Sequence, residues 1–496
     1  MPDQASGLDV LRGASPSAIN VIIDRNGTVR RRPGIDTTTI GPEDGLADEI
    51  IGLHSTATGR NYALSVGSFP GKVEVHELFE GSSAAYGSFL GKTRPVITET
   101  EAMLVIASSL DPEKVLFDTN EVDALEGSPP SGSHVITNSS RLLLNDAITD
   151  KTRVFFSAPA LGTSITGHET WNDPLTSGSF VAEGAIDPVV AITQNSNEVW
   201  VFGTQSLQTF QTDATLVYVS QATMEFGCAT PFGIIKRDQE FAWLDDKRRF
   251  IRSDGRDAEP FSQPIQQTLE ELERVDDCFG YRVVTGPIDA YVWSFPTDGR
   301  SLVYQVGGGW STWMSYDDGL ANWVPLVVTA HTFVLNSNDN LVGLADGRLG
   351  VLRNGVNTDL GARIPAYIET GFIDRGSDSR KNCIAVRVAL RRGNTPAVIS
   401  PAEVVDYAGP ECQTPSGTPD DVSVAEEPFG TLTYRDDEGA WRTPFPLSLG
   451  KSGDRQIVIT IRSLGIYQRR QWRITFHGTS DFVLAGVTEE YLVLNN

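Results

Sequence analysis

The stretch GSFLGKT, residues 87–93, is typical of a phosphate-binding loop, in which backbone N–H groups and a Lys hold phosphate oxygens. That motif needs four residues between its two glycines, and Tyr86 occupies the position of the first glycine. Pro95 also lies where the following helix should begin its run. We therefore expect a hairpin turn here and no nucleotide site.

The stretch SYDDGLANW, residues 315–323, is close to the turn S-x-D-x-G-x-T-W of sialidase-type propellers. Trp323 comes one residue late and the Thr is absent, so we expect a tight turn between strands. A glycosidase also needs a pair of carboxylates on either side of the scissile bond. With 64 acidic residues in the chain, the sequence singles out no such pair.

The remaining residues capable of catalysis or metal binding show no motif. The six His lack the spacing of metal ligands, and the four Cys contain no C-x-x-C pair, so we expect buried thiols. No G-x-S-x-G nucleophile turn occurs. The sequence predicts no catalytic residues, no metal site and no cofactor, and hence a protein that is not an enzyme.

Charge is distributed unevenly along the chain. The formal net charge is −24, yet the first 34 residues contain five Arg and three Asp. Such an acidic balance argues against tight nucleic-acid binding, which needs clustered Lys and Arg. It suits a channel wall from which a DNA duplex is repelled.

Ten arginines in three basic clusters are candidate contacts with acidic neighbours, such as copies of the same protein, because Arg pairs well with carboxylates at interfaces. The alternative is that they are solvated residues that protect strand edges from aggregation. They are Arg25, Arg30, Arg31, Arg32, Arg380, Arg391, Arg392, Arg469, Arg470 and Arg473.

The elements that would position these residues are strands. Segments rich in Val, Ile, Phe and Tyr are separated by turn pairs such as Asn26-Gly27 and Asp298-Gly299. One helix is expected over residues 263–275, where Ile265, Leu269 and Leu272 recur on one face. The chain is therefore all-β.

A loose repeat runs from Ile50 to Arg353, each unit being an apolar strand, a polar turn, a second strand and a more polar edge. The spacing of about 45 residues is that of a four-stranded β-propeller blade. We predict a β-propeller-like domain of six or seven blades over residues 50–360, the alternative being a stacked β-sandwich. The units begin near Ile50, Val96, Ser133, Pro188, Phe232, Tyr281 and Leu326.

The segments on either side of this repeat have different patterns of apolar and polar residues. Residues 361–496 alternate apolar and polar residues over longer strands, which predicts a β-sandwich-like domain, with a surface loop at 401–428. Residues 1–49 are interpreted as an N-terminal assembly arm and first strands. The N-terminus lacks the apolar core of a signal peptide, and no apolar run is long enough to span a bilayer.

Three segments carry a resemblance to a known family. The opening INVIIDRNGTVRRRPGI, residues 19–35, has Asn20, Asp24 and Gly27 followed by Arg-Pro-Gly. The central segment consists of residues 199–211 and 225–251 and the helix after Pro264. The third segment is RRQWRITFHGTSDFVLAGVTEEYLV, residues 469–493. Together they resemble the tail hub or nozzle proteins of short-tailed bacteriophages (podoviruses), also called packaged-DNA stabilisation proteins.

That resemblance implies a structural virion protein, made in the host cytoplasm and carried in the tail. It implies a homo-hexamer around an axial channel, bound to the head-to-tail adaptor ring and to a tail needle, spikes or fibres. Double-stranded DNA would be retained and then conducted during ejection without sequence-specific binding, and without stable membrane insertion. The alternatives are a propeller that binds or hydrolyses glycans and an intracellular propeller scaffold.

Overall fold

The computed structural model describes residues 3–4, 17–182, 187–212, 218–392, 430–447, 456–477 and 482–494. The chain divides into two compact units. One, here the propeller unit, comprises Pro33–Val306 and Thr312–Asn354; the other, here the C-terminal unit, comprises Met1–Arg32, Gly307–Ser311 and Gly355–Asn496. The segment predicted as an N-terminal arm is therefore divided between them, because its strands pair with partners more than 300 residues away.

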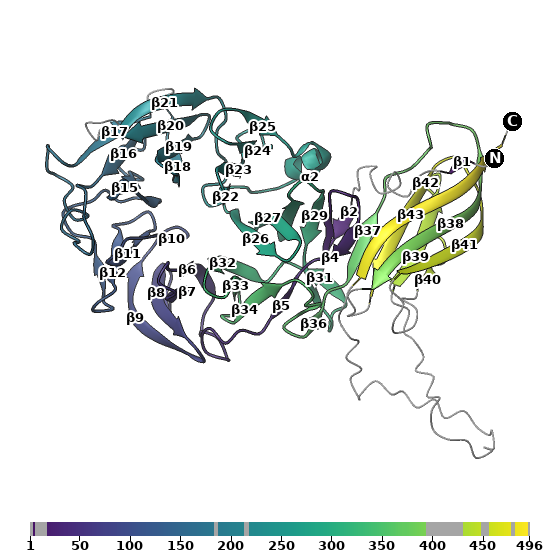
Figure 1. The fold of residues 1–496 in the computed structure, drawn as a ribbon, viewed down its shortest axis with the longest axis horizontal. Helices are drawn as coiled ribbons and strands as arrows, with labels where there is room; N and C mark the ends of the chain where they lie inside the picture. Colours follow the sequence, from purple (N-terminus) through teal and green to yellow (C-terminus); the bar gives the residue numbers. More distant parts are fainter. Residues whose placement is uncertain are drawn as a thin grey trace, which may run out of the picture. The chain divides into compact units, whose positions relative to one another are not determined.

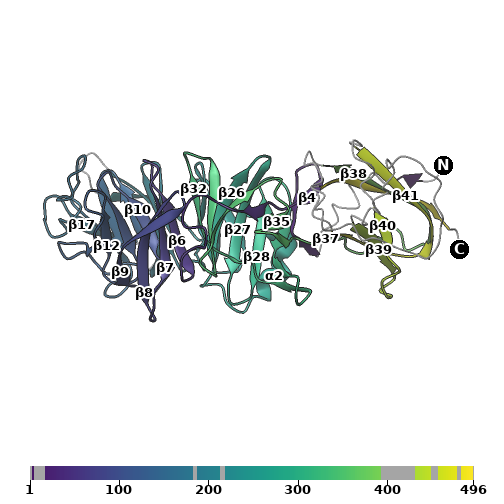
Figure 2. The ribbon, with the colours of Figure 1, turned by 90° about the horizontal axis from the view of Figure 1, so that it is seen from below.

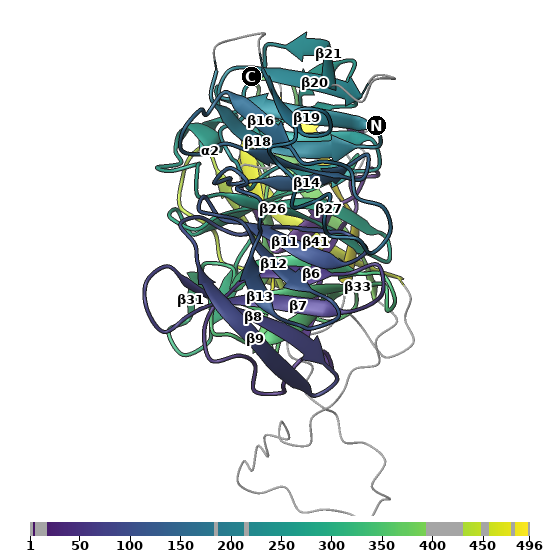
Figure 3. The same ribbon diagram turned by 90° about the vertical axis from the view of Figure 1, so that its left-hand side faces the viewer.

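The propeller unit contains seven β-sheets, which confirms the predicted all-β propeller. The sheets are arranged in a ring in Figure 1 and overlap in the side view of Figure 3. Blade 1 contains β6 (Ile50–Ser55), β7 (Asn61–Val66), β8 (Lys72–Phe79) and β9 (Ser82–Leu90). Blade 2 contains β10 (Val96–Glu99), β11 (Met103–Ala107), β12 (Glu113–Leu116) and β13 (Val122–Ala124). Blade 3 contains β14 (Val135–Asn138), β15 (Arg141–Asn145), β16 (Arg153–Phe156) and β17 (Gly178–Val181).

The other four blades follow in chain order. Blade 4 contains β18 (Val189–Asn195), β19 (Glu198–Gly203), β20 (Leu207–Thr212) and β21 (Tyr218–Met224). Blade 5 contains β22 (Ile235–Arg237), β23 (Glu240–Leu244), β24 (Phe250–Ser253) and β25 (Ala258–Pro260). Blade 6 contains β26 (Phe279–Thr285), β27 (Ile288–Phe295), β28 (Arg300–Gln305) and β29 (Trp310–Trp313). Blade 7 contains β32 (Val328–Val334), β33 (Asp339–Leu344), β34 (Leu349–Arg353) and β5 (Gly34–Asp36).

Blade 7 closes the ring with a strand from the start of the chain. Its fourth strand, β5, pairs antiparallel with β34, with Ile35 opposite Leu352. Ile35 is buried. Blade 7 thus contains strands from both ends of the propeller sequence, and their pairing holds the first and last parts of the ring together.

The blades pack face to face through their middle strands. The second strand of a blade, such as MLVIA in β11 or FAWL at Phe241–Leu244 of β23, is apolar without alternation because neighbouring blades cover both faces of the sheet. Between blades 4 and 5, the rings of Trp200 and Phe241 lie 4.7 Å apart within one apolar cluster. Aromatic pairs of this kind contribute about 0.5–1.5 kcal/mol beyond the area that they bury.

The helix after blade 5 is shorter than its apolar pattern predicts. It consists of a 3-10 turn, η1 (Gln263–Ile265), and α2 (Gln266–Glu270). Arg248 donates from Nη1 to the carbonyls of Leu269, Glu270 and Leu272, at 3.2, 3.1 and 2.6 Å. These bonds satisfy the carbonyls at the end of the helix and account for its early end.

The C-terminal unit contains two sheets with an apolar core that draws on both, seen as two layers in Figure 2. One sheet has the order β3 (Val21–Ile23), β4 (Val29–Arg31), β43 (Phe482–Val493), β38 (Lys381–Arg392) and β41 (Gln456–Tyr467), with β1 (Asp3–Gln4) also beside β43. In the other, β2 (Ser17–Ile19), β37 (Ala366–Glu369), β42 (Arg470–Phe476), β39 (Gly430–Asp436) and β40 (Phe445–Leu447) follow one another. This arrangement confirms the predicted C-terminal sandwich; the predicted loop at 401–428 lies outside the described residues.

Short hairpins complete the description: β30 (Ser315–Asp317) with β31 (Asn322–Val324), and β35 (Thr358–Asp359) with β36 (Ala362–Arg363). The first of these is the predicted tight turn, in which Asp317 Oδ1 accepts hydrogen bonds from the backbone of Gly319 and Leu320. The phosphate-loop-like stretch is different from the predicted hairpin turn. Gly87 lies inside β9, and residues 91–93 connect blades 1 and 2.

Candidate functional site

The signature at the start of the chain forms a β-hairpin. Gly27 adopts φ 73° at the turn between β3 and β4, a conformation that glycine enters at no steric cost. Asp24 Oδ2 accepts hydrogen bonds from Thr28 Oγ1 and from the Arg30 guanidinium, at 3.0 and 2.6 Å. The described part of the predicted basic arm thus contains a hairpin, and Arg30 has a partner within it.

Arg32 is the buried centre of this segment. Its side chain is 0% exposed, its Nε donates to Asn20 Oδ1 at 3.0 Å, and its Nη1 and Nη2 donate to the two carboxylate oxygens of Asp359. Asn20 adopts φ 56° and donates from Nδ2 to the carbonyl of Pro365. The Asn and the Arg of the signature therefore join the hairpin to the β35 region inside the C-terminal unit.

The arginines near the C-terminus are also bonded within the chain. Arg470 is 0% exposed, donates from Nε to Asp436 Oδ1 at 2.6 Å and from Nη2 to the carbonyl of Leu464 at 2.8 Å. Arg473 pairs with Glu369 at 2.8 Å, and the exposed Arg469 pairs with Glu438 at 2.8 Å. Two of these three arginines therefore stabilise the sandwich directly.

A buried ionic cluster surrounds Glu489 on β43. Arg375 donates to Glu489 Oε2 at 2.9 Å, and the Tyr467 hydroxyl donates to Oε1 at 2.7 Å. Burial first, and then the adjacent carboxylate, raise the pKa of Tyr467. Removing one partner from such a cluster leaves an uncompensated charge, so its role is structural.

The other candidate arginines differ in exposure. Arg31 is buried, with its guanidinium 5.4 Å from the centroid of the Phe482 ring. Arg25, Arg380 and Arg391 are exposed, and the side chain of Arg392 lies outside the described residues. Contact of the ten arginines with a neighbouring subunit stays a prediction, and the exposed Arg380 and Arg391 are among the members that a partner could reach without disturbing the fold.

Five of the six histidines belong to the propeller unit, and His477 belongs to the C-terminal unit. Among the described residues, no set of three or more His, Cys, Asp or Glu could hold a metal ion. His134 Nε2 donates to the carbonyl of Pro231 at 2.9 Å, and its ring stacks on Phe232. Burial lowers the pKa of His134, and that of His331, to about 4. The three described cysteines, Cys228, Cys278 and Cys383, are buried free thiols.

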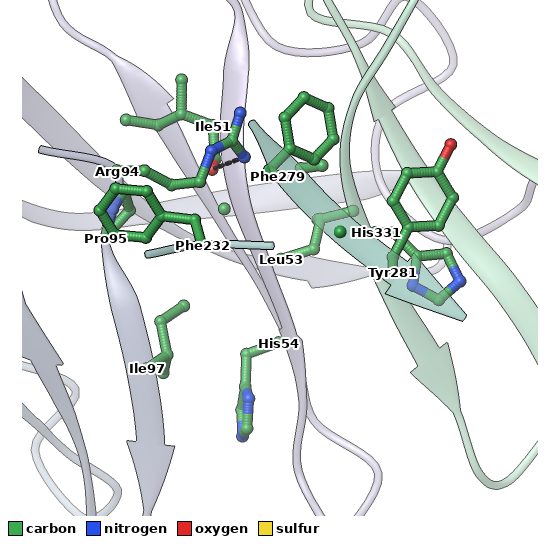
Figure 4. A pocket seen from close by; sticks show the side chains of 13 residues that line it. Ile51, Leu53, His54, Arg94, Pro95, Ile97, Phe232, Phe279, Tyr281 and His331 are labelled. Carbon is green, nitrogen blue, oxygen red and sulfur yellow. Dashed lines mark hydrogen bonds between the residues drawn. The ribbon is translucent and has the colours of Figure 1, made fainter. Parts of the chain in front are cut away.

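Sequence reasoning missed a cavity of about 170 Å³ near the inner strands of the propeller (Figure 4). It is lined by residues of β6, β10, β26 and β32 and by the segments before β10 and β22. The side chains include Arg94, His54 and His331, the rings of Phe232, Phe279 and Tyr281, and no Asp or Glu among the described residues that line it. A lone Arg before a Pro carries no sequence signal, which is why the cavity was not predicted.

The comparisons with known proteins bear on the propeller. The family model described as "Bacteriophage P22 Gp10, beta-propeller" matches residues 163–357, which run from the end of blade 3 through blade 7. This match supports a phage structural propeller protein and a place in the virion. No curated protein matches the sequence.

Among solved structures, the chain is similar to the extracellular domain described as that of a one-component system of B. thetaiotaomicron, at 10% identity and a TM-score of 0.42, covering 71% of this chain. The chain spans 43% of the length of that protein. It is also similar to virginiamycin B lyase from Staphylococcus aureus, at 8% identity and a TM-score of 0.41, with 62% of this chain and 96% of that chain covered. Likenesses at this level carry no argument about function.

Proposed function

We propose that this protein is the tail hub or nozzle of a short-tailed phage. Six copies would form a tube between the head-to-tail adaptor ring and the tail tip, with a needle, spikes or fibres attached. The tube would retain packaged DNA and conduct it during ejection, and no catalysis would be involved. The observation that carries this proposal is the match of the phage propeller family to residues 163–357.

Charge supports the same function. A net charge of −24 gives each copy a strongly negative field, which would keep a DNA duplex from adhering to a channel wall. No helix in the described part of the chain is long and apolar enough to cross a membrane. The proposed mechanism is thus mechanical and electrostatic.

The experiment that tests the proposal is electron microscopy of the purified protein, alone and mixed with the adaptor ring of the same virion. Class averages should show a sixfold tube with an axial opening wide enough for a DNA duplex, either alone or on the adaptor. A protein that stays monomeric in the presence of the adaptor would overturn the proposal.

The exposed arginines give a sharper test of how the tube forms. We expect that Arg380→Glu with Arg391→Glu will reduce incorporation onto the adaptor by about tenfold, because the variant loses pairing with acidic groups and adds repulsion. Arg256→Glu, at an exposed turn of blade 5, is the control for charge reversal elsewhere. Equal incorporation of both variants would exclude Arg380 and Arg391 as contacts.

A further inference from the structure

We propose that the cavity of the propeller unit binds a small carboxylate with a short apolar body, held by Arg94. The inference concerns a ligand of the propeller and does not rest on the proposed tail function. It is carried by the hydrogen bonds that Arg94 makes, by those that it does not make, and by the residues that surround it.

Arg94 is anchored by one edge of its guanidinium. Its Nη1 donates to the carbonyls of Ile51 in blade 1 and Thr329 in blade 7, at 2.9 and 2.7 Å. The guanidinium carbon lies 4.0 Å from the centroid of the Phe279 ring, on blade 6. The side chain is thereby fixed among three blades, as Figure 4 shows for Ile51 and Phe279.

The other edge of the guanidinium is available. Nε and Nη2 of Arg94 make no hydrogen bond to any described residue, and neither belongs to the buried nitrogen atoms that are sealed from solvent. Arg94 is one of the residues that line the cavity. Nε and Nη2 are the pair of donors that binds both oxygens of a carboxylate.

The same edge is filled by a carboxylate elsewhere in this chain. Arg60 donates from Nε and Nη2 to the two oxygens of Glu77, at 2.6 and 2.7 Å. Arg282 binds Asp289 in the same way, at 2.7 and 3.1 Å. Arg94 has the same two donors, and no described carboxylate forms a hydrogen bond with them, so that an external carboxylate would complete a pair of this kind.

Electrostatics favour an anion over a cation. Burial lowers the pKa of Arg94 to about 10, an effect that the charge of Glu49 opposes, so the guanidinium stays positive at neutral pH. Glu99, the acidic group nearest to the lining His54, already accepts from that ring at 3.1 Å and from the backbone of Ala57. A positive group without a lining carboxylate stands out in a protein with a net charge of −24.

The walls set the size and character of the ligand. Phe232, Phe279 and Tyr281 present aromatic rings, and Ile51, Leu53 and Ile97 add aliphatic surface. The volume of about 170 Å³ is comparable with that of an engineered cavity of about 150 Å³ that binds benzene. Benzoate therefore has the size and charge of a suitable probe.

The first experiment compares benzoate with benzamide, which has nearly the same shape without the charge, by calorimetric titration of the full-length protein. We expect benzoate to bind at least tenfold more tightly, because only the carboxylate makes two charge-assisted hydrogen bonds to Arg94. Equal affinity of the two compounds, or no heat from benzoate at about 10 mM, overturns the proposal.

The second experiment uses a matched pair of variants. Arg94→Met should weaken benzoate binding at least tenfold. Arg141→Met is the control, because Arg141 also donates from Nη1 to two carbonyls and lies 5.0 Å from a Phe ring centroid, yet its Nε is sealed from solvent and it lines no part of this cavity. Benzoate affinity should be retained in Arg141→Met, and equal losses in both variants would contradict the assignment.

A third variant and a peptide complete the test. Arg94→Lys keeps the charge and loses the paired donors, so about tenfold weaker binding of benzoate is expected even if Arg94→Met fails to fold.

A tripeptide ending in a Phe carboxylate, compared with its C-terminal amide, shows whether the bound carboxylate belongs to the end of a polypeptide or to a small free acid. Tighter binding of the peptide acid than of benzoate assigns the site to a polypeptide end, and weaker binding assigns it to a free acid.

Discussion

At the scale of single residues, the basic clusters of this acidic protein combine exposed arginines with buried ones that stabilise the fold. Arg32 and Arg470 are 0% exposed, and both hold a carboxylate through paired donors. Replacing Arg30, Arg31 and Arg32 with Ser would therefore remove a buried ion pair in addition to two other positive charges. Assembly and folding have to be separated before any effect on incorporation is interpreted.

The first prediction concerns Arg32. Arg32→Met should lower the free energy of unfolding of the C-terminal unit by about 3–5 kcal/mol, because Asp359 would be left as a buried charge without its partner. Arg469→Met is the control, since the Arg469–Glu438 pair is 50% and 66% exposed and should contribute less than about 1 kcal/mol. Urea unfolding followed by Trp fluorescence measures both, and similar effects of the two variants would show that the Arg32 pair is not a structural anchor.

The second prediction concerns pH. In the folded chain the pKa of His134 is about 4, whereas an unfolded His titrates near 6.5, so acid protonates the unfolded state first. The contribution of His134 is thus fully present above pH ~6.5 and is lost as the pH falls toward ~4, up to about 3 kcal/mol.

His134→Gln tests this, because Gln can still donate to the carbonyl of Pro231. The free energy of unfolding, measured between pH 7 and ~4, should fall less steeply with decreasing pH in the variant. The difference in slope should correspond to about one proton fewer taken up on unfolding. The same slope in both proteins would mean that His134 does not titrate on unfolding.

At the scale of elements, the blades could be predicted from the repeat of apolar strands and polar turns along the chain. The predicted unit starts near Ile50, Val96 and Pro188 lie within a few residues of β6, β10 and β18. Apolar strands and polar turns are local features, and burial on both faces makes the second strand of each blade conspicuous. The fold class and the blades were therefore predictable from the sequence.

What the sequence could not show depends on pairing over long distances. β5 has only three residues, and its partner β34 begins more than 300 residues later, at Leu349. No local sequence pattern therefore predicts the closure of the ring. The helix ended early because Arg248 caps it from another segment. Arg94 is likewise an isolated residue, whose role arises only when Ile51, Thr329 and Phe279 come together from three blades.

The third prediction concerns ring closure. Ile35→Pro removes a backbone donor in the middle of β5 and should destabilise the propeller unit by about 1–3 kcal/mol beyond the cost of the changed side chain. Ile35→Val is the control at the same position, because it keeps the backbone and should cost only about 0.5–1.5 kcal/mol. Thermal unfolding and limited proteolysis at blades 1 and 7 measure the difference, and equal stability of the two variants would show that β5 does not hold the ring closed.

At the scale of the whole molecule, charge opposes the assembly that we propose. Each copy carries a net charge of −24, so copies brought together in a ring repel one another. The adaptor would have to supply compensating contacts, and the exposed Arg380 and Arg391 are few in comparison. Assembly without the adaptor should therefore depend strongly on ionic strength.

The last prediction follows from that balance. Raising NaCl from about 10 to 150 mM shortens the Debye length from roughly 30 to 8 Å, which screens repulsion between copies more than it weakens close ion pairs. Sedimentation velocity of the protein alone should show a larger share of oligomers at the higher salt concentration, and an equal ionic strength of KCl should have the same effect. A decrease of oligomers with salt would mean that attraction between opposite charges dominates the interface, and the contacts of the basic clusters would then outweigh the net charge in holding the tube together.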